Sequence, residues 1–474
     1  MKKIIPFLLV SCLLASLAAC GPTGQPSEVS DSSPVSSSDV VSAQELESSS
    51  EVESSHPVQD TVPSFDTTGT IQETVLYEKN GVKITATDLV CSLTGAEISL
   101  TIENNSAQDL SFSSGTLGYS CNAVNGIMVD DGYLNCDVAA GKSANETVSF
   151  SSQELLLYGI DRVADFQLGF SITDPGYNST HIPPIVVATS LKGYEQPADS
   201  IQTAVQSEAL QSLLGYQVPF FQTGNFYDQN GVKVETAGLM ENSSGEQMLL
   251  LEVVNSGEQS VCFVINNIAF NGMEVYSYNW SSDVILPGAR RMVMLQLENV
   301  FDKEYWPAYG LDSIGAVSMN VSLNDLEGNP LTEGTPLQVQ LSDVEATVDS
   351  QGIEVYNEGG IRVLSKKLAE DGNGDLSALL LVENTSGQTV TAGVGYDSLS
   401  IGGVMNDFTC SDRNIPNGGK AALVINLRDL EENGITSVEN ITDLEFQLQI
   451  RNEANYQTIA EPKVTLTFAG GTAV

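Results

Sequence analysis

The chain has 474 residues, and its 61 acidic residues outnumber its 19 basic residues, giving a formal net charge of −42. Nucleic-acid binding depends on clustered Lys and Arg that displace counterions, so this composition excludes a nucleic-acid partner and disfavours direct adhesion to anionic lipid. With only two histidines, His56 and His181, the chain cannot assemble a His-Cys metal cluster or a Ser-His-Asp triad. We therefore expect a protein that is not an enzyme and has no catalytic residues.

The N-terminus has the pattern of an export signal. Lys2 and Lys3 precede an apolar run, residues 4–17, that is too short to cross a bilayer as a helix. The segment that follows, Leu17-Ala18-Ala19-Cys20-Gly21, resembles the lipobox of bacterial lipoproteins. This resemblance implies a signal peptide over residues 1–19, a covalent lipid on Cys20, and a location on the extracellular face of the cell membrane. An ordinary secretory signal with a chance cysteine at its cleavage site is the alternative.

The next segment, residues 20–70, is rich in Ser, Val, Pro, Asp and Glu and has almost no large apolar residue. Such a stretch cannot bury enough surface to offset the entropy lost when it becomes ordered. We expect a disordered tether with a root-mean-square span of roughly 40 Å, which separates the folded part from the membrane.

An internal repeat organises the chain from residue 76 onward. Residues 76–83, 226–233 and 355–362 share the order Tyr, a polar pair, Gly and a β-branched residue. An alternating strand then follows in each segment and ends at an Asn. Further landmarks recur in the same order at two later turns and in one later strand. The repeated positions are Gly81, Gly231 and Gly360; Asn104, Asn255 and Asn384; Gly126, Gly272 and Gly403; Gly141, Gly288 and Gly418.

The later strand of each segment alternates apolar and polar residues, as in Phe166, Leu168, Phe170 and Ile172. A period of two predicts one buried face and one wet face. Six or seven such strands in about 115 residues, separated by Gly, Asn and Pro turns, are typical of an antiparallel sandwich. The fold class is therefore all-β, with three tandem β-sandwich domains, which we place at residues 71–191, 225–342 and 343–474.

The three segments resemble the immunoglobulin-like domains of unknown function in lipoproteins of Gram-positive bacteria. The resemblance covers residues 76–468 and concerns the strand pattern, without the Cys and Trp signature of antibody domains. It implies a fold and no active site.

Residues 192–224 join the first two segments and contain a helical pattern. Ile201, Val205, Leu210 and Leu214 fall on one face of a helix that we expect to begin near Asp199 and to end at Gly215. We expect this helix to pack on a neighbouring sandwich.

Five cysteines follow Cys20, namely Cys91, Cys121, Cys136, Cys262 and Cys410. An odd number spread over three segments does not indicate a disulfide framework. Cys121 and Cys136 have the spacing for one short loop, but small buried hydrophobic residues are the favoured interpretation.

Two segments are candidate sites. Asp371, Asn373 and Asp375 place oxygen ligands at alternate positions, as calcium loops do, but the Gly and the bidentate Glu of an EF-hand are missing. A plain acidic hairpin is favoured over a calcium site, and we expect no cofactor or metal.

The second segment carries an aromatic insertion that the other two lack, because its interval from Gly288 to Gly310 is longer than those from Gly141 to Gly159 and from Gly418 to Gly434. A local cap over the sandwich edge is the favoured interpretation and a binding patch is the alternative, and we expect at least two of the rings to be partly exposed. The residues are Phe301, Tyr305, Trp306 and Tyr309.

The leading functional hypothesis is a non-catalytic, membrane-anchored extracellular lipoprotein whose sandwiches bind a protein or a wall polymer of the cell envelope. A solute-binding lipoprotein of a transporter is an alternative, although such proteins are built from alternating strands and helices around a cleft. A hydrolase acting on wall polymers is a second alternative, and it requires a pair of carboxyl groups in a cleft.

Overall fold

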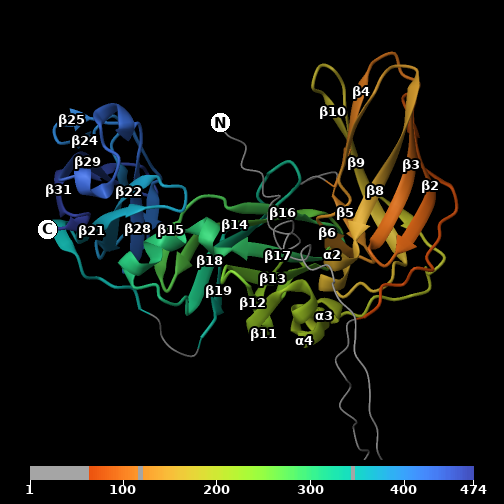
Figure 1. Cartoon of the computed structure of the whole chain (residues 1–474), viewed down its shortest axis with the longest axis horizontal. Coiled ribbons are helices and arrows are strands. Elements are labelled where there is room, and N and C mark those ends of the chain that lie inside the picture. Colours follow the sequence, from red (N-terminus) through yellow and green to blue (C-terminus); the bar gives the residue numbers. More distant parts are fainter. Residues whose placement is uncertain (1–62, 116–120, 343–346) are drawn as a thin grey trace, which may run out of the picture.

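The computed structural model describes residues 63–115, 121–342 and 347–474, and its secondary structure is mostly β-strand (Figure 1). The predicted all-β fold class is confirmed. The predicted signal peptide, Cys20, His56 and most of the predicted tether lie outside the described residues.

Copy 1, as we name the first group of strands, runs from β1 to β10 and includes the short helix α2. Its elements are β1 (Thr74–Lys79), β2 (Val82–Ser92), β3 (Gly95–Asn104), β4 (Leu110–Ser114), β5 (Asn122–Val124), β6 (Ile127–Val129), β7 (Leu134–Val138), β8 (Lys142–Ser151), α2 (Ser152–Leu157), β9 (Asp165–Thr173) and β10 (Ser179–Ala188).

Copy 2 runs from β11 to β19 and has two short helical turns, α5 and η2, before its second-last strand. Its elements are β11 (Tyr216–Gln229), β12 (Val232–Asn242), β13 (Gln247–Asn255), β14 (Val261–Phe270), β15 (Met273–Tyr276), β16 (Ser281–Ile285), β17 (Arg290–Gln296), α5 (Leu297–Val300), η2 (Lys303–Tyr309), β18 (Ala316–Asn324) and β19 (Thr335–Gln340).

Copy 3 runs from β20 to β32. Its elements are β20 (Ile353–Glu358), β21 (Ile361–Glu370), β22 (Leu376–Asn384), β23 (Val390–Val394), β24 (Ser400–Ile401), β25 (Val404–Met405), β26 (Phe408–Cys410), β27 (Arg413–Ile415), β28 (Lys420–Leu427), η3 (Leu430–Asn433), η4 (Val438–Asn440), β29 (Asp443–Asn452), β30 (Thr458–Ala460), β31 (Lys463–Ala469) and β32 (Thr472–Ala473).

The same order of antiparallel pairing occurs in all three copies. The first sheet pairs β1-β2-β3-β8 in copy 1, β11-β12-β13-β17 in copy 2 and β20-β21-β22-β28 in copy 3. The second sheet is built around β9, β18 or β29: β9 pairs with β4, β5 and β10, β18 with β14 and β19, and β29 with β23, β24 and β31. The middle hairpin of each copy is β5–β6, β14–β15 or β24–β25. The second strand of each copy also has a bulge, after Ala86, Val234 or Ser365, which in copy 2 lies two residues nearer the preceding turn.

The repeated glycines stand at equivalent turns, as predicted. Gly81, Gly231 and Gly360 each join the first two strands with φ between +78° and +82°, and the residue before each also has a positive φ. Two consecutive residues with positive φ make the two-residue hairpin turn that matches the twist of antiparallel strands, and Gly adopts this conformation without steric cost.

The repeated asparagines have a structural role that their position alone does not reveal. Asn104, Asn255 and Asn384 are fully buried. In copy 3, the Asn384 amide donates to the carbonyls of Gln388, at 2.7 Å, and Ile415, at 2.8 Å, and its oxygen accepts from the Ser386 N–H. The corresponding three bonds form in the other two copies. One side chain thus connects a turn to the second sheet in each copy.

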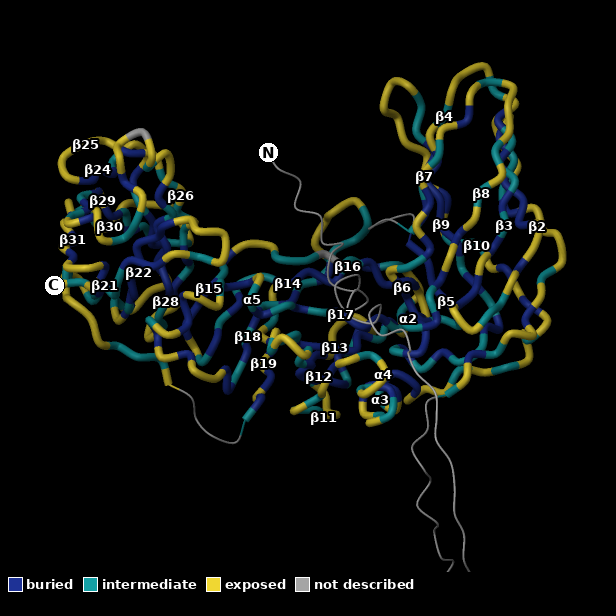
Figure 2. Tube along the Cα trace, in the orientation of Figure 1, coloured by how far each residue is buried: buried dark blue, intermediate teal, exposed yellow. Residues whose placement is uncertain are grey.

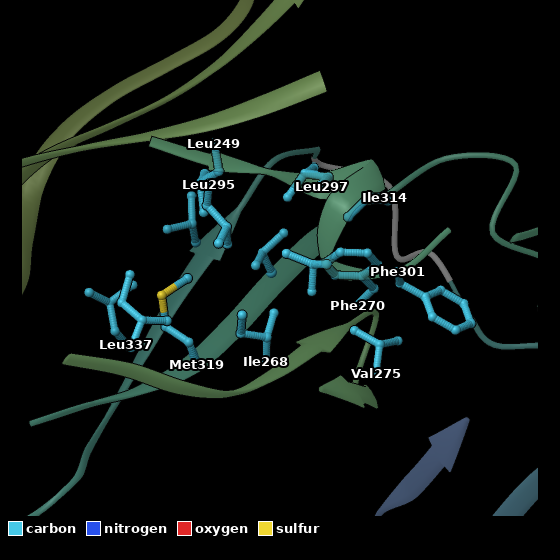
Figure 3. Packing of buried hydrophobic residues seen from close by; sticks show 14 of the residues in the cluster. Leu249, Ile268, Phe270, Val275, Leu295, Leu297, Phe301, Ile314, Met319 and Leu337 are labelled. Atoms are coloured by element: carbon cyan, nitrogen blue, oxygen red, sulfur yellow. The ribbon is translucent and has the colours of Figure 1, made fainter. Parts of the chain in front are cut away.

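The alternating strands bury the predicted faces. Phe166, Leu168 and Phe170 are fully buried, as are their counterparts in β18 and β29. In copy 2, Leu249 and Leu295 from one sheet face Ile268 and Met319 from the other (Figure 3). These apolar faces form the interior of each sandwich, and their burial is the main favourable contribution to folding.

Two expectations about connecting segments need correction. Residues 63–70, placed in the disordered tether, are ordered against copy 1: Phe65 is buried in its core and the Asp66 N–H donates to the Asp161 carbonyl at 2.7 Å. The single helix expected from Asp199 to Gly215 is two helices, α3 (Ser200–Gln206) and α4 (Glu208–Leu214). Ser207 breaks the helix because its backbone is extended, and its hydroxyl accepts from the Leu210 N–H and caps α4.

Candidate functional site

The aromatic insertion of copy 2 is buried, so the predicted exposure of at least two rings is wrong. The exposed fractions are 4% for Phe301, 5% for Tyr305, 7% for Trp306 and 0% for Tyr309. The physical reason is that η2 lies against β21 and β22 of copy 3, whose sheet covers the surface that copy 2 alone leaves open, while α5 packs on β13 and β17 of its own copy.

Each ring of η2 has a defined partner. The Tyr305 hydroxyl lies 3.0 Å from the Ser377 hydroxyl, and the Tyr309 hydroxyl donates to the Leu380 carbonyl at 3.0 Å; both partners are in β22 of copy 3. The Trp306 indole N–H donates to the Phe301 carbonyl at 2.8 Å, within copy 2. Burial raises the pKa of Tyr305 to about 12, so its hydroxyl is held in the neutral form. The insertion is therefore the joint between copies 2 and 3.

Copy 3 receives these rings on the outer face of its first sheet, which we call its receiving face. The receiving face is apolar and buried, and it belongs to the same hydrophobic cluster as the rings of copy 2. Its apolar members are Leu364, Ala369, Leu379, Leu381, Ala422 and Val424.

A strand contact continues the joint. β15 of copy 2 runs parallel to β28 of copy 3, with Met273 beside Lys420 and Glu274 beside Ala421. The hairpin of β14 and β15, together with η2, forms what we call the docking end of copy 2. Figure 1 shows β15 and β28 side by side where the second and third groups of strands meet.

Buried charge lies beside this strand contact. The Ser277 hydroxyl donates to the Glu274 carboxyl, and the Asn414 N–H of copy 3 contacts both groups. Arg413 of copy 3 is also buried, and its guanidinium donates to the Ala422 carbonyl at 2.9 Å. Burial raises the pKa of Glu274 to about 7, and the hydrogen bonds and the charge of Arg413 offset that effect only in part.

The joint between copies 1 and 2 has the same construction. β6 of copy 1 runs parallel to β17 of copy 2, with Ile127 beside Arg290, and β6 follows the hairpin turn that is equivalent to the one before β15. The outer face of the first sheet of copy 2 is again apolar and buried, and it packs with Tyr158 and with α3. Its apolar members are Met240, Leu250 and Met292.

Ion pairs are more prominent in this first joint. The Arg291 guanidinium of copy 2 contacts Asp130 of copy 1 at 2.7 Å and Asp283 at 3.0 Å. Burial opposes the charge of Arg291, but the two carboxylates outweigh it and raise the pKa of the guanidinium. The buried Glu252 contacts Arg290 at 2.8 Å and accepts from Gln202 of α3 at 3.0 Å. The linker helix is thus part of the joint, as its apolar face predicted.

The receiving position of copy 1 differs from those of copies 2 and 3. The outward side chains of β8, Ser143, Asn145, Thr147 and Ser149, are polar and exposed. In the described part of the chain, no copy precedes copy 1, and its outer face needs no apolar cover. The array therefore begins with a polar face and continues with two apolar, covered faces.

The calcium candidate forms a hairpin turn between β21 and β22. The Asp371 carboxylate accepts the N–H groups of Asn373, at 2.8 Å, and Asp375, at 2.9 Å. The Asp375 carboxylate pairs with Arg428 at 3.1 Å. These contacts satisfy the carboxylates from within the chain and fit the favoured interpretation as an acidic hairpin.

Cys121 and Cys136 do not form the disulfide that the spacing permits. Burial raises the pKa of both thiols to about 11, and Cys121 packs with Ala123 and Met128 in a small cluster that copy 2 completes. Across residues 63–115, 121–342 and 347–474, no group of three or more His, Cys, Asp or Glu residues is placed to hold a metal ion. Within the same ranges no helix has the length and apolar character needed to cross a membrane.

No family model matches the chain, and no curated protein matches it. Among solved structures it is similar to a protein of unknown function from Porphyromonas gingivalis W83, with 11% identity, a TM-score of 0.13 and coverage of 54% of this chain and 100% of that one. It is also similar to the exo-chitosanase CsxA of Amycolatopsis orientalis, with 7% identity, a TM-score of 0.16 and coverage of 82% and 79%. Similarities this weak carry no argument about activity or ligand.

Proposed function

We propose that the chain is a lipid-anchored extracellular protein that binds another protein or a wall component through its tandem β-sandwiches and carries out no catalysis. The observation that carries the proposal is that the buried aromatic and charged side chains lie in the joints between copies. The buried Tyr, Trp, Glu and Arg residues described above close the joints between copies, where they hold a row of sandwiches in place. Such a row is the arrangement expected of a protein whose binding surfaces lie at a distance from its lipid anchor.

The location has its own test, because it depends on the lipobox pattern at Cys20. Cys20→Ala should release the protein from membranes, since the lipid is the expected anchor and two or more acyl chains are needed for stable attachment. Membrane fractionation at high salt measures this. A mutant that still sediments with membranes would contradict the lipid anchor.

The binding role is tested with the mature, lipidated protein as bait in solubilised envelope extracts. A specific partner, identified and then shown to bind the purified chain, is the expected result. Recovery of no specific protein or wall polymer would contradict the binding role, and turnover of purified wall polymer would contradict the absence of catalysis.

A further inference from the structure

The two joints define docking ends in copies 1 and 2, and the corresponding end of copy 3 is uncovered by any residue that the structure describes. β24 and β25 form the third instance of the middle hairpin, with Gly402 and Gly403 at its turn. In copies 1 and 2 the first residue after the turn, Ile127 or Met273, is at most 1% exposed, and its strand pairs with a strand of the next copy. The same position in copy 3 is Val404, which is 52% exposed, and the next residue, Met405, is 59% exposed.

The exposed hairpin lies at the end of the row that faces away from copy 2 (Figure 1). Figure 2 shows it as an exposed loop beside the buried strands of copy 3. β25 pairs with β24. An edge strand with exposed apolar side chains is a template for pairing with another chain, and proteins usually protect such edges.

The charges around this end follow the pattern of the internal joints. In both joints the docking end supplies a carboxylate, Asp130 or Glu274, and the copy that receives it supplies an arginine. Copy 3 has Asp407, Asp429 and Glu431 exposed on the segments next to β25. The Asn433 amide donates to Asn406 at 2.8 Å and the Arg428 N–H donates to the Asp407 carbonyl at 2.8 Å, which holds these segments together.

A second copy of this chain does not fit this end. The receiving faces of copies 2 and 3 are already covered, and the corresponding face of copy 1 is polar, with Ser143, Asn145 and Thr147 pointing outward. The net charge of −42 also opposes self-association.

We infer that the β24–β25 hairpin of copy 3 is the surface through which the protein binds a separate protein, one that offers an apolar β-sheet face with a basic rim. The partner occupies the position that copy 2 occupies on β6 and that copy 3 occupies on β15: a strand lies parallel to β25 and apolar side chains cover Val404 and Met405. Main-chain pairing gives affinity, and the charged rim sets the orientation and the rate of association. This inference rests on the proposed binding role and names its surface and the class of its partner.

The experiment places the photoreactive residue benzoylphenylalanine at position 405 of the full, lipidated chain in cells with its native envelope. Two control positions carry the same residue: Val90, an exposed strand position in copy 1 with the same exposed fraction as Val404, and Tyr177, an exposed hairpin tip in copy 1. Irradiation should cross-link position 405 to one protein whose mass differs from that of this chain. The partner, once identified and purified, should bind the wild-type chain at least tenfold more tightly than the Val404→Glu variant, and Val90→Glu should bind as the wild type does. Binding should weaken as salt is raised, because the rim contacts are ionic.

The outcomes separate the surface from the function. Adducts at Tyr177 or Val90 without one at position 405 would overturn this surface and leave the binding role intact. No adduct at any position, together with no partner from the extracts, would overturn both. A self-adduct at position 405, or a partner whose binding is unaffected by Val404→Glu while that variant melts like the wild type, would also overturn the inference.

Discussion

The two joints share one backbone arrangement and close it with different chemistry. In both, the second strand of the middle hairpin runs parallel to the fourth strand of the next copy's first sheet, as β6 does with β17 and β15 with β28. The first joint adds two helices and the ion pair of Arg291 with Asp130, whereas the second adds the aromatic rings of η2. The strand contact and the apolar receiving face thus define the docking geometry, and the surrounding side chains are exchangeable.

The largest expected effect concerns the rings of the second joint. Replacing Tyr305 and Trp306 together with Ala should lower the free energy of unfolding by about 6 kcal/mol, since each buried ring contributes about 3 kcal/mol or more. Urea and thermal unfolding measure this. Tyr456→Ala, which removes an exposed ring, is the matched control and should leave stability unchanged. If the double mutant melts like the wild type, the joint between copies 2 and 3 does not exist in solution.

A smaller loss of unfolding free energy is expected at the repeated asparagines, whose hydrogen bonds lie inside each copy and not between copies. Asn384→Ala should cost about 3 kcal/mol, because it leaves the buried carbonyls of Gln388 and Ile415 without a donor and removes an acceptor from Ser386. Asn104→Ala and Asn255→Ala should cost similar amounts, as their bonds are equivalent. Unfolding of the three single mutants tests this, with Asn373→Ala in an exposed turn as control. Unequal losses would show that these bonds contribute differently to stability in the three copies, although the strands pair in the same order.

The charge at the second joint should make stability depend on pH. The pKa of Glu274 is raised from its ordinary value of 4.5 to about 7 by burial, so the folded protein holds this proton more tightly than the unfolded chain does. The stabilisation is fully present below pH 4.5 and is lost as the pH rises through about 7, with a total of about 3 kcal/mol.

Glu274→Gln should therefore flatten the fall in unfolding free energy between pH 5 and pH 8 and should be the more stable protein at pH 8. Unfolding in urea at several pH values measures this, with the exposed Glu97→Gln as control. Glu154, a buried residue of α2 in copy 1, also has a pKa that is raised by its burial first and by Asp131 second, so some pH dependence should persist in the Glu274→Gln variant. An unchanged slope would contradict the burial of Glu274.

The sequence predicted the repeat because turns and alternation are local properties. Gly81 and Asn104 have counterparts at fixed spacing, and each is required by a backbone conformation or a buried bond inside its own copy. The aromatic insertion was misinterpreted because the burial of Trp306 depends on a face presented by another copy. The signal was nevertheless present: β22 reads Leu-Ser-Ala-Leu-Leu-Leu-Val, apolar on both faces, whereas β3 alternates apolar and polar residues. A strand without alternation is covered on both sides, and this pattern distinguishes copy 3 from copy 1.

The smallest expected effect is at the acidic hairpin, where both partners of the ion pair are exposed, in contrast to the first joint, where Arg291 is buried. Asp375 and Arg428 form an ion pair with both side chains near half exposed, so Asp375→Asn should change stability by about 1 kcal/mol or less. Calcium should also leave the melting temperature unchanged, because the Asp371 Oδ1 already accepts the N–H groups of Asn373 and Asp375 and the Asp375 carboxylate pairs with Arg428, so a metal would compete with these contacts. Melting with calcium and with a chelator tests this, and Asp371→Ala provides the matched variant. A rise of several degrees with calcium that disappears in Asp371→Ala would show that the turn reorganises into a metal site, and that exposed charge in this protein is used for binding and not only for solubility.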